Sequence, residues 1–169
     1  IETLIDTLES NYNIDTSKIY ATGFSNGADF SYSLACYLND RFAAIAGVAG
    51  LMAEESITYC APNKNTGIMV IHGTSDNSRP FSGIDQWYLS IDDAIQYWTN
   101  FNNTDSTFNY NYIDENNNQI ELYDFFDEKN INMVKLLKVI NGGHYWFDLQ
   151  YEGNNLDQNI WNFLSLHSK

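Results

Sequence analysis

The chain has 169 residues, enough for one domain with a sizeable core, and its 44% apolar and 18% charged residues are typical of a globular protein. Its net charge of −14 would repel phosphate groups, so we exclude nucleic-acid binding through a basic surface. No apolar run approaches the roughly 20 residues that a membrane-spanning helix needs.

The first half of the chain alternates helical and strand patterns. Apolar residues at helical spacing predict a helix over Ile1–Tyr12, followed by a short strand at Lys18–Phe24. A second helix is expected at Asn26–Leu38, with four residues turned inward: Phe30, Leu34, Ala35 and Leu38. Ala43–Ala49 and Gly67–His72 are continuously apolar, which is typical of strands covered on both faces.

The second half continues this alternation and adds a hairpin. Ser90–Phe101 is predicted to be a helix capped by Ser90, with an apolar stripe of Ile91, Ala94, Ile95 and Trp98. Phe108–Ile113 and Gln119–Phe125 alternate as hairpin strands do. Met133–Ile140 is a further strand, and Leu156–Leu166 a last helix with Ile160, Phe163 and Leu164 inward.

This order of elements predicts an α/β fold with a largely parallel sheet, flanked by helices and carrying one inserted hairpin. No repeat or linker divides the chain, so residues 1–169 are expected to form a single domain. The first helix starts without a preceding cap or loop, so we expect an N-terminally truncated domain.

Gly23-Phe24-Ser25-Asn26-Gly27 matches the pattern G-x-S-x-G between a predicted strand and a predicted helix. A sharp turn there exposes the Ser25 hydroxyl and aims the Asn26 backbone N–H at an oxyanion. Ser25 is therefore a candidate nucleophile with Asn26 as oxyanion donor; the alternative is a plain structural turn.

A serine nucleophile needs a base and an acid that orients the base. His144 is the candidate base because it follows a strand through two glycines. His72 is expected to be a buried or edge histidine that shapes its loop, and His167 to lie in a frayed tail.

The candidate acid is Asp76, which comes just after a buried strand and so lies at the same sheet edge as Ser25 and His144. The rival acids lie in a loop, at a helix start or beyond the histidine: Asp85, Asp92, Asp93 and Asp148. The chain order Ser, Asp, His is the order found in α/β-hydrolases.

Three segments resemble secreted esterases of the polyhydroxybutyrate depolymerase and feruloyl esterase group: Asp15–Gly50, Val70–Gly83 and Ile140–Phe147. The motifs of that group are of the type D-x-x-R/K-V/I-Y-x-T-G-x-S-N-G-G, H-G-x-x-D and G-G-H-x-W-P. The resemblance implies an α/β-hydrolase fold whose early strands are missing here, with Ser25 as nucleophile, Asp76 as acid and His144 as base.

The chain departs from that family in several places. Ala28 stands where the family has a second glycine, and Phe147 where it has a proline. Asn103–Lys129 is longer than the family needs at this point. No His-Gly oxyanion loop precedes Ser25, so Asn26 would supply one donor where two are expected.

Cys36 and Cys60 resemble a disulfide pair that is common in the secreted members, and the alternative is two reduced, buried thiols. A disulfide would indicate export and a secreted, extracellular protein.

Aromatic side chains are further candidates for substrate contact. Trp146, two residues after the proposed base, could stack on an aryl or sugar ring, and Trp87 could line a substrate groove. The hairpin tyrosines Tyr110, Tyr112 and Tyr123 are expected to be ordinary strand-face residues. No calcium loop is expected at Asp114, because the glycine and glutamate that such a loop needs are absent.

The sequence therefore predicts a secreted serine carboxylester hydrolase that needs no metal and no organic cofactor. Its expected partner is a polymer-linked ester substrate: plant-wall feruloyl or acetyl esters, or polyhydroxyalkanoate. One alternative is a truncated, non-catalytic hydrolase lobe that binds polysaccharide or a partner. A peptidase on the same fold is another.

Overall fold

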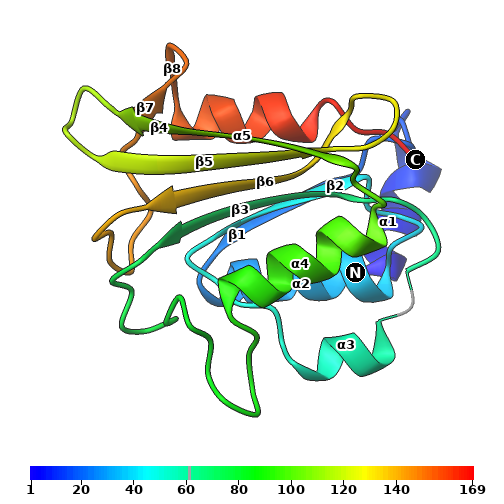
Figure 1. Cartoon of the computed structure of the whole chain (residues 1–169). Coiled ribbons are helices and arrows are strands. Elements are labelled where there is room, and N and C mark those ends of the chain that lie inside the picture. Colours follow the sequence, from blue (N-terminus) through cyan, green and yellow to red (C-terminus); the bar gives the residue numbers. More distant parts are fainter. Residues whose placement is uncertain (61) are drawn as a thin grey trace.

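The structure, a computed structural model, describes residues 1–60 and 62–169 and is built around a six-stranded sheet (Figure 1). The sheet has the order β1-β2-β3-β6-β5-β4. Its strands are β1 (Tyr20–Phe24), β2 (Ala44–Val48), β3 (Gly67–Gly73), β4 (Ser106–Ile113), β5 (Gln119–Phe126) and β6 (Asn132–Val139). The first four strands in that order run parallel, and β5 runs antiparallel to both of its neighbours, β6 and β4. This confirms the mostly parallel sheet with an inserted hairpin.

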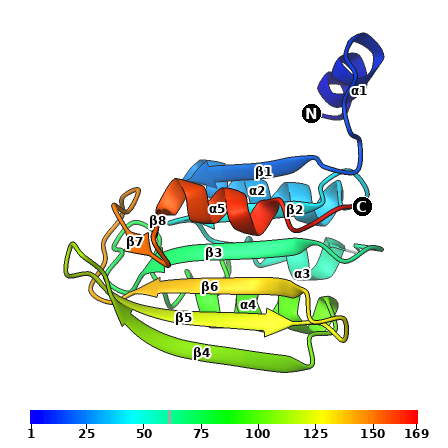
Figure 2. The ribbon, with the colours of Figure 1, turned by 90° about the horizontal axis from the view of Figure 1, so that it is seen from above.

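Helices cover the sheet unevenly. The helices are α1 (Glu2–Asn11), α2 (Asn26–Tyr37), α3 (Glu55–Tyr59), α4 (Ile91–Phe101) and α5 (Leu156–Leu164). In Figure 1, α2, α3 and α4 lie on one face and α5 lies on the other. A two-stranded ribbon of β7 (Gln150–Tyr151) and β8 (Asn154–Asn155) precedes α5. Figure 2 shows α1 beyond β1, outside these layers.

The elements that sequence patterns predicted to be buried are buried in the structure. Every residue of β2 and β3 is buried, as expected for strands covered on both faces. Ser90 caps α4 by accepting a hydrogen bond from the Asp93 backbone N–H at 3.0 Å, and the four stripe residues of that helix are buried. Local periodicity therefore identified these elements correctly.

One inward residue was predicted wrongly on α2. Phe30 is 52% exposed, whereas the helix turns small residues such as Ala28 toward the sheet. A Cβ built at Gly47 would lie 3.3 Å from the Ala28 methyl, and one built at Gly50 would overlap it. The close approach of α2 to these two glycines sets its inward face and leaves Phe30 outside. Among the described residues, no helix is both long enough and apolar enough to cross a membrane.

Candidate active site

Ser25 joins the end of β1 to the start of α2 in a backbone conformation that residues with side chains rarely adopt. Its φ is 54°, in the left-handed region, where strain of about 1–3 kcal/mol must be offset by the surrounding structure. The Ser25 N–H donates to the Val48 carbonyl at 2.9 Å. Gly23 also lies so close to Gly27 that a Cβ on Gly23 would be 2.3 Å from the Gly27 carbonyl carbon. These contacts hold the turn that presents the Ser25 hydroxyl at the sheet edge.

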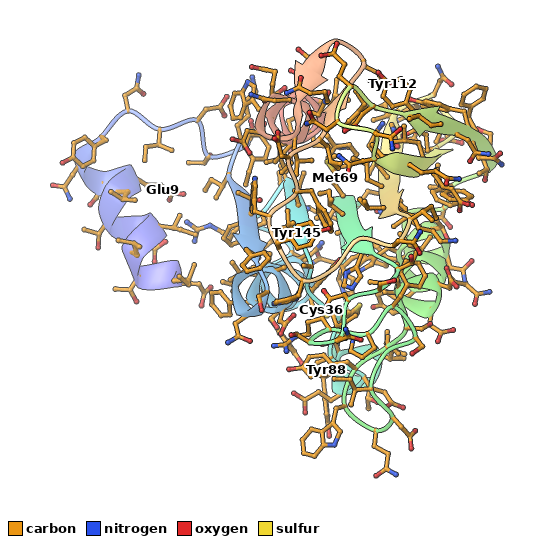
Figure 3. The ribbon with its side chains drawn as sticks, turned by 90° about the vertical axis from the view of Figure 1, so that its left-hand side faces the viewer. Glu9, Cys36, Met69, Tyr88, Tyr112 and Tyr145 are labelled. Carbon is orange, nitrogen blue, oxygen red and sulfur yellow. A yellow bond between two sulfur atoms is a disulfide. The ribbon has the colours of Figure 1, made fainter. Side chains whose placement is uncertain are left out.

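His144 follows β6 and reaches the serine across the carboxyl edge of the sheet. Its Nε2 lies 3.0 Å from Ser25 Oγ, and its Nδ1 lies 2.8 Å from Asp76 Oδ2. The Phe24 ring packs against the imidazole, with ring centroids 4.9 Å apart. The structure therefore brings the three candidate residues into one hydrogen-bonded chain. Figure 3 looks onto this edge, with the neighbouring Tyr145 labelled.

Asp76 follows β3 and is only 4% exposed. Its Oδ1 accepts hydrogen bonds from the backbone N–H groups of Ser78 and Arg79, both at 2.8 Å, which leaves Oδ2 for His144. Burial acts to raise the pKa of Asp76, but the hydrogen bonds from Arg79, His144 and Ser78 outweigh it and place this pKa below its ordinary value. The carboxylate is thus held ionised beside the imidazole.

The loops that carry Asp76 and His144 are bonded to one another. The Ser75 N–H donates to the Gly142 carbonyl at 2.9 Å, and the Asn141 N–H donates to Thr74 Oγ1 at 2.8 Å. A Cβ on Gly73 would lie 2.2 Å from the Gly142 carbonyl oxygen, so only a glycine permits this approach. The distance between acid and imidazole is therefore fixed by backbone packing.

Asn26 is the first residue of α2. The first backbone N–H groups of a helix have no partner within it, and the helix dipole favours negative charge there. The Asn26 side-chain oxygen accepts a hydrogen bond from Arg79 Nη2. This arrangement suits the Asn26 N–H to an oxyanion formed beside Ser25.

Comparison with known proteins shows the family of this chain. A sequence model described as "Dienelactone hydrolase family" matches residues 1–108, which is more than half of the chain. The chain belongs to the dienelactone hydrolase family.

Named relatives of this dienelactone hydrolase family member are esterases. This chain is 36% identical over 84 residues to a probable feruloyl esterase C of Aspergillus niger. That alignment covers 49% of this chain and 30% of the relative. The chain is 24% identical over 166 residues to the bifunctional acetylxylan esterase/xylanase XynS20E of Neocallimastix patriciarum, covering 98% of this chain and 22% of that protein. The matched part is thus under a third of either relative.

Solved structures confirm the α/β-hydrolase fold. An acetyl xylan esterase from Aspergillus awamori matches with a TM-score of 0.66 at 13% identity, covering 98% of this chain and 65% of that one. A thermostable esterase matches with a TM-score of 0.60 at 17% identity, covering 99% of this chain and 36% of that one. At these identities the likeness concerns the fold alone.

Arg79 and Asp29 were not among the residues predicted from the sequence; they contact each other beside the turn at residues 23–27, called the elbow turn below. Arg79 Nε and Nη2 lie 3.1 and 2.9 Å from Asp29 Oδ2, and Asp29 Oδ1 accepts from the Leu51 N–H at 2.8 Å. The guanidinium also lies 5.5 Å from the centre of the Tyr88 ring. Their positions in the sequence could have pointed to them: Arg79, one of two arginines, comes three residues after Asp76, and Asp29 comes four residues after Ser25.

The two tryptophans expected to contact substrate are placed differently from each other. Trp87 is 71% exposed and lies in a loop that pairs with Ala53–Glu54 through the bond from the Glu54 N–H to the Trp87 carbonyl. Trp146 is 42% exposed, and its Nε1 donates to Asp157 Oδ1 at 3.0 Å, at the start of α5. Within the described part of the chain, neither is hydrogen-bonded to the Ser25–His144–Asp76 chain.

The other two histidines are buried. His72 Nε2 is bonded to the Arg79 carbonyl at 2.7 Å, and burial lowers the pKa of His72, so it shapes the loop as expected. His167 was predicted wrongly to lie in a frayed tail. It is 5% exposed, its ring packs on Phe163 with centroids 4.8 Å apart, and the Lys169 N–H is bonded to the Ser17 carbonyl. Contacts with Ser17 and with Gly67, at the start of β3, hold this tail in place.

Cys36 and Cys60 form a disulfide, the pairing that the family resemblance implied. It joins α2 to the end of α3, within the core on the face of the sheet that α2, α3 and α4 cover. Within residues 1–60 and 62–169, no three metal-ligating side chains come together.

Proposed function

We propose that this chain carries the catalytic residues of a serine carboxylester hydrolase that works through an acyl-enzyme. The observation that supports the proposal is the chain of contacts from Ser25 Oγ to His144 Nε2, at 3.0 Å, and from His144 Nδ1 to Asp76 Oδ2, at 2.8 Å. A hydroxyl, an imidazole and a buried carboxylate in this order form the arrangement that activates a serine.

In the first half-reaction Ser25 Oγ attacks the ester carbonyl carbon while His144 Nε2 takes its proton. Asp76 accepts the Nδ1–H hydrogen bond, which fixes the tautomer and stabilises the imidazolium. The tetrahedral intermediate collapses, its bond to the alcohol oxygen breaks, and His144 returns the proton to the departing alkoxide. Water then attacks the acyl-serine with His144 again as base, and this releases the acid and restores Ser25.

Negative charge develops on the carbonyl oxygen in both steps. The Asn26 N–H at the start of α2 is proposed as one donor to that oxyanion, and the dipole of the helix acts in the same direction. Arg79, which binds the Asn26 side chain, is a cation close to this position. A single donor typically contributes about 10²–10³ in turnover.

The proposed substrates are plant-wall feruloyl or acetyl esters, with polyhydroxyalkanoate as a further candidate. The named relatives include a feruloyl esterase and an acetylxylan esterase, which supports the first two. The net charge of −14 disfavours strongly anionic polymers. The exposed indoles of Trp87 and Trp146 are proposed contacts for aryl or sugar groups.

The disulfide between Cys36 and Cys60 supports a secreted protein, because such bonds are scarce in the cytosol. A purely non-catalytic binding lobe would have no use for the strained Ser25 conformation or for an ionised acid held on the imidazole. These two features favour catalysis over that alternative.

The experiment is hydrolysis of p-nitrophenyl acetate by the wild-type chain, Ser25→Ala and Ser82→Ala. Ser82 is an exposed serine in the loop after Asp76 and serves as the matched control. We expect Ser25→Ala to lose turnover and Ser82→Ala to retain it. Equal turnover by all three proteins would show that Ser25 is not the nucleophile.

A further inference from the structure

A hollow lies away from Ser25, over the hairpin of β4 and β5. It has a volume of about 650 Å³, within the usual range of ligand sites. Three aromatic residues of β4 line it, Phe108, Tyr110 and Tyr112, together with the segment Tyr151–Gly153. This hollow is called the hairpin groove below.

The floor of the hairpin groove is a row of aromatic rings. Phe108, Tyr110 and Tyr112 alternate along β4, so their side chains share one face at intervals of about 6.8 Å. Their partners on β5 are Asp124, Leu122 and Ile120. In Figure 2, α5 lies over the β1–β2–β3 side of the sheet and leaves this face of the hairpin uncovered. The row is therefore accessible from solvent on this face: Phe108 is 59% exposed, and Tyr110 and Tyr112 are half-buried.

The wall of the groove is fixed to this floor. Asp114, in the hairpin turn, accepts from the Gln150 N–H at 3.2 Å, and the Asn116 and Asn118 side chains donate to the Asp148 carbonyl, both at 3.2 Å. These bonds hold the turn against the segment that leads into β7.

The turn between β7 and β8 is fixed in the same way. Asn159 of α5 donates to the carbonyls of Tyr151, at 3.0 Å, and Asn154, at 3.2 Å. The Tyr110 hydroxyl donates to Glu152 Oε1 across the groove. A groove held at both ends is preorganised, and binding a ligand there costs little further ordering.

We propose that the hairpin groove binds a neutral carbohydrate chain, separately from the ester-cleaving site. The faces of phenyl and phenol rings carry partial negative charge and attract the C–H faces of sugar rings. Glu152 and the tyrosine hydroxyls offer acceptors and donors to sugar hydroxyls. A linear row of rings in an open groove fits an extended, repeating ligand.

Charge favours a neutral ligand over a charged one. Glu152 and the net charge of −14 oppose an anion. Asp124, one of the two carboxylates that line the groove, already pairs with Lys135 at 2.8 Å, which weakens its attraction for a cation. The Lys135 ammonium also lies 6.0 Å from the centre of the Tyr151 ring, where a cationic ligand would meet repulsion.

The groove is distinct from the Ser25 site in residues and in place. None of Ser25, Asp76 and His144 lines it. In Figure 3, Tyr112 lies on the hairpin, apart from Tyr145 of the histidine loop. The inference therefore does not depend on the proposed catalysis, and it gives a role to the long Asn103–Lys129 segment.

The test is isothermal titration calorimetry with xylohexaose as the neutral probe, against oligogalacturonate as anion and a glucosamine hexamer as cation. Proteins compared are wild type, Phe108→Ala, Tyr112→Ala and, as a matched control, Tyr59→Ala, which removes a tyrosine that is 68% exposed on α3. We expect each groove variant to weaken xylohexaose binding by about tenfold and Tyr59→Ala to leave it unchanged.

Three outcomes would overturn the proposal: no binding of xylohexaose to wild type at millimolar concentration, equal binding by all four proteins, or tighter binding of either charged probe. Phe108 is the most exposed ring of the row, so Phe108→Ala tests the groove even where Tyr112→Ala lowers stability. Turnover of p-nitrophenyl acetate is expected to stay at the wild-type level in both groove variants, which separates this proposal from failure of the catalytic one.

Discussion

Arg79 and Asp29 form a two-bonded ion pair in which both guanidinium hydrogen bonds end on Asp29 Oδ2, from Nε at 3.1 Å and from Nη2 at 2.9 Å. Through its backbone N–H, Arg79 also bonds Asp76, and through Nη2 it bonds the Asn26 side chain. One residue therefore connects the loop of the acid to the helix that begins beside the nucleophile.

Replacing Arg79 is expected to lower kcat/KM without unfolding the protein. Arg79→Gln keeps the backbone bond to Asp76 but removes the ion pair that positions Asn26, and a small misplacement of catalytic groups costs up to about 100-fold. Arg79→Lys should recover little, because an ammonium cannot make the same forked contact. Steady-state kinetics with p-nitrophenyl acetate measure the effect.

Arg41 is the matched control for this prediction. It pairs with Asp6 and Glu9 of α1, at 2.9 and 2.8 Å, and touches none of the catalytic candidates. Arg41→Gln should retain wild-type kcat/KM. Equal activity of the Arg79 and Arg41 variants would show that the Arg79–Asp29 pair does not position the site.

The two glycines of the elbow turn are expected to differ in their tolerance of alanine. A Cβ on Gly23 would meet the Gly27 backbone at 2.3 Å, whereas a Cβ on Gly27 has no atom within 4 Å. Gly23→Ala should therefore destabilise the fold by about 1–3 kcal/mol or more, a loss of several degrees in Tm. In a calorimetric scan, Gly27→Ala should have a Tm close to that of the wild type. A lower Tm for Gly27→Ala than for Gly23→Ala would contradict the geometry of this turn.

Acid should weaken the fold through His167. Burial, followed by the positive charge of Lys169, lowers the pKa of His167 to about 4, against about 6.5 in an unfolded chain. Between these values the unfolded chain binds a proton that the folded one does not. The contribution of His167 to stability is thus complete above about pH 6.5 and falls as the pH drops toward 4, by about 3 kcal/mol in total.

Urea unfolding at several pH values measures how the free energy of unfolding changes with pH. His167→Phe should flatten the decline between pH 6.5 and 4, although His72, whose pKa burial also lowers, will leave part of it. An identical slope in the wild type and the variant would mean that His167 is accessible to protons in the folded state.

Reduction of the Cys36–Cys60 disulfide should lower stability. The bond closes a loop with a sequence separation of 24. By lowering the entropy of the unfolded chain, a loop of this length stabilises the fold by roughly 3–4 kcal/mol. Thermal melts with and without dithiothreitol should differ for wild type and coincide for Cys36→Ala/Cys60→Ala. Wild-type melts that coincide would show that the bond does not stabilise the fold.

The sequence predicted those features that local patterns specify. The capped stripe of α4 and the continuous apolar runs of β2 and β3 needed no knowledge of their neighbours, because spacing alone defines them. The positions of Ser25, Asp76 and His144 followed from one rule, that the carboxyl ends of parallel strands share an edge. Their contacts agree with that placement.

Features that depend on contacts between distant segments were missed. The inward face of α2 is set by its close approach to Gly47 and Gly50, so the helical pattern of apolar residues wrongly placed Phe30 on that face. The Arg79–Asp29 pair joins residues 50 positions apart, and no periodicity encodes it. His167 is likewise buried by Gly67, a hundred residues away in the chain.

Covalent labelling tests the central claim most directly. The protein is incubated with a fluorophosphonate, digested and mapped by mass spectrometry, with His144→Ala treated in parallel. We expect one adduct, on Ser25, which forms far more slowly in His144→Ala because the hydroxyl has lost its base. An adduct on another residue, or labelling of Ser25 at the same rate in both proteins, would contradict it.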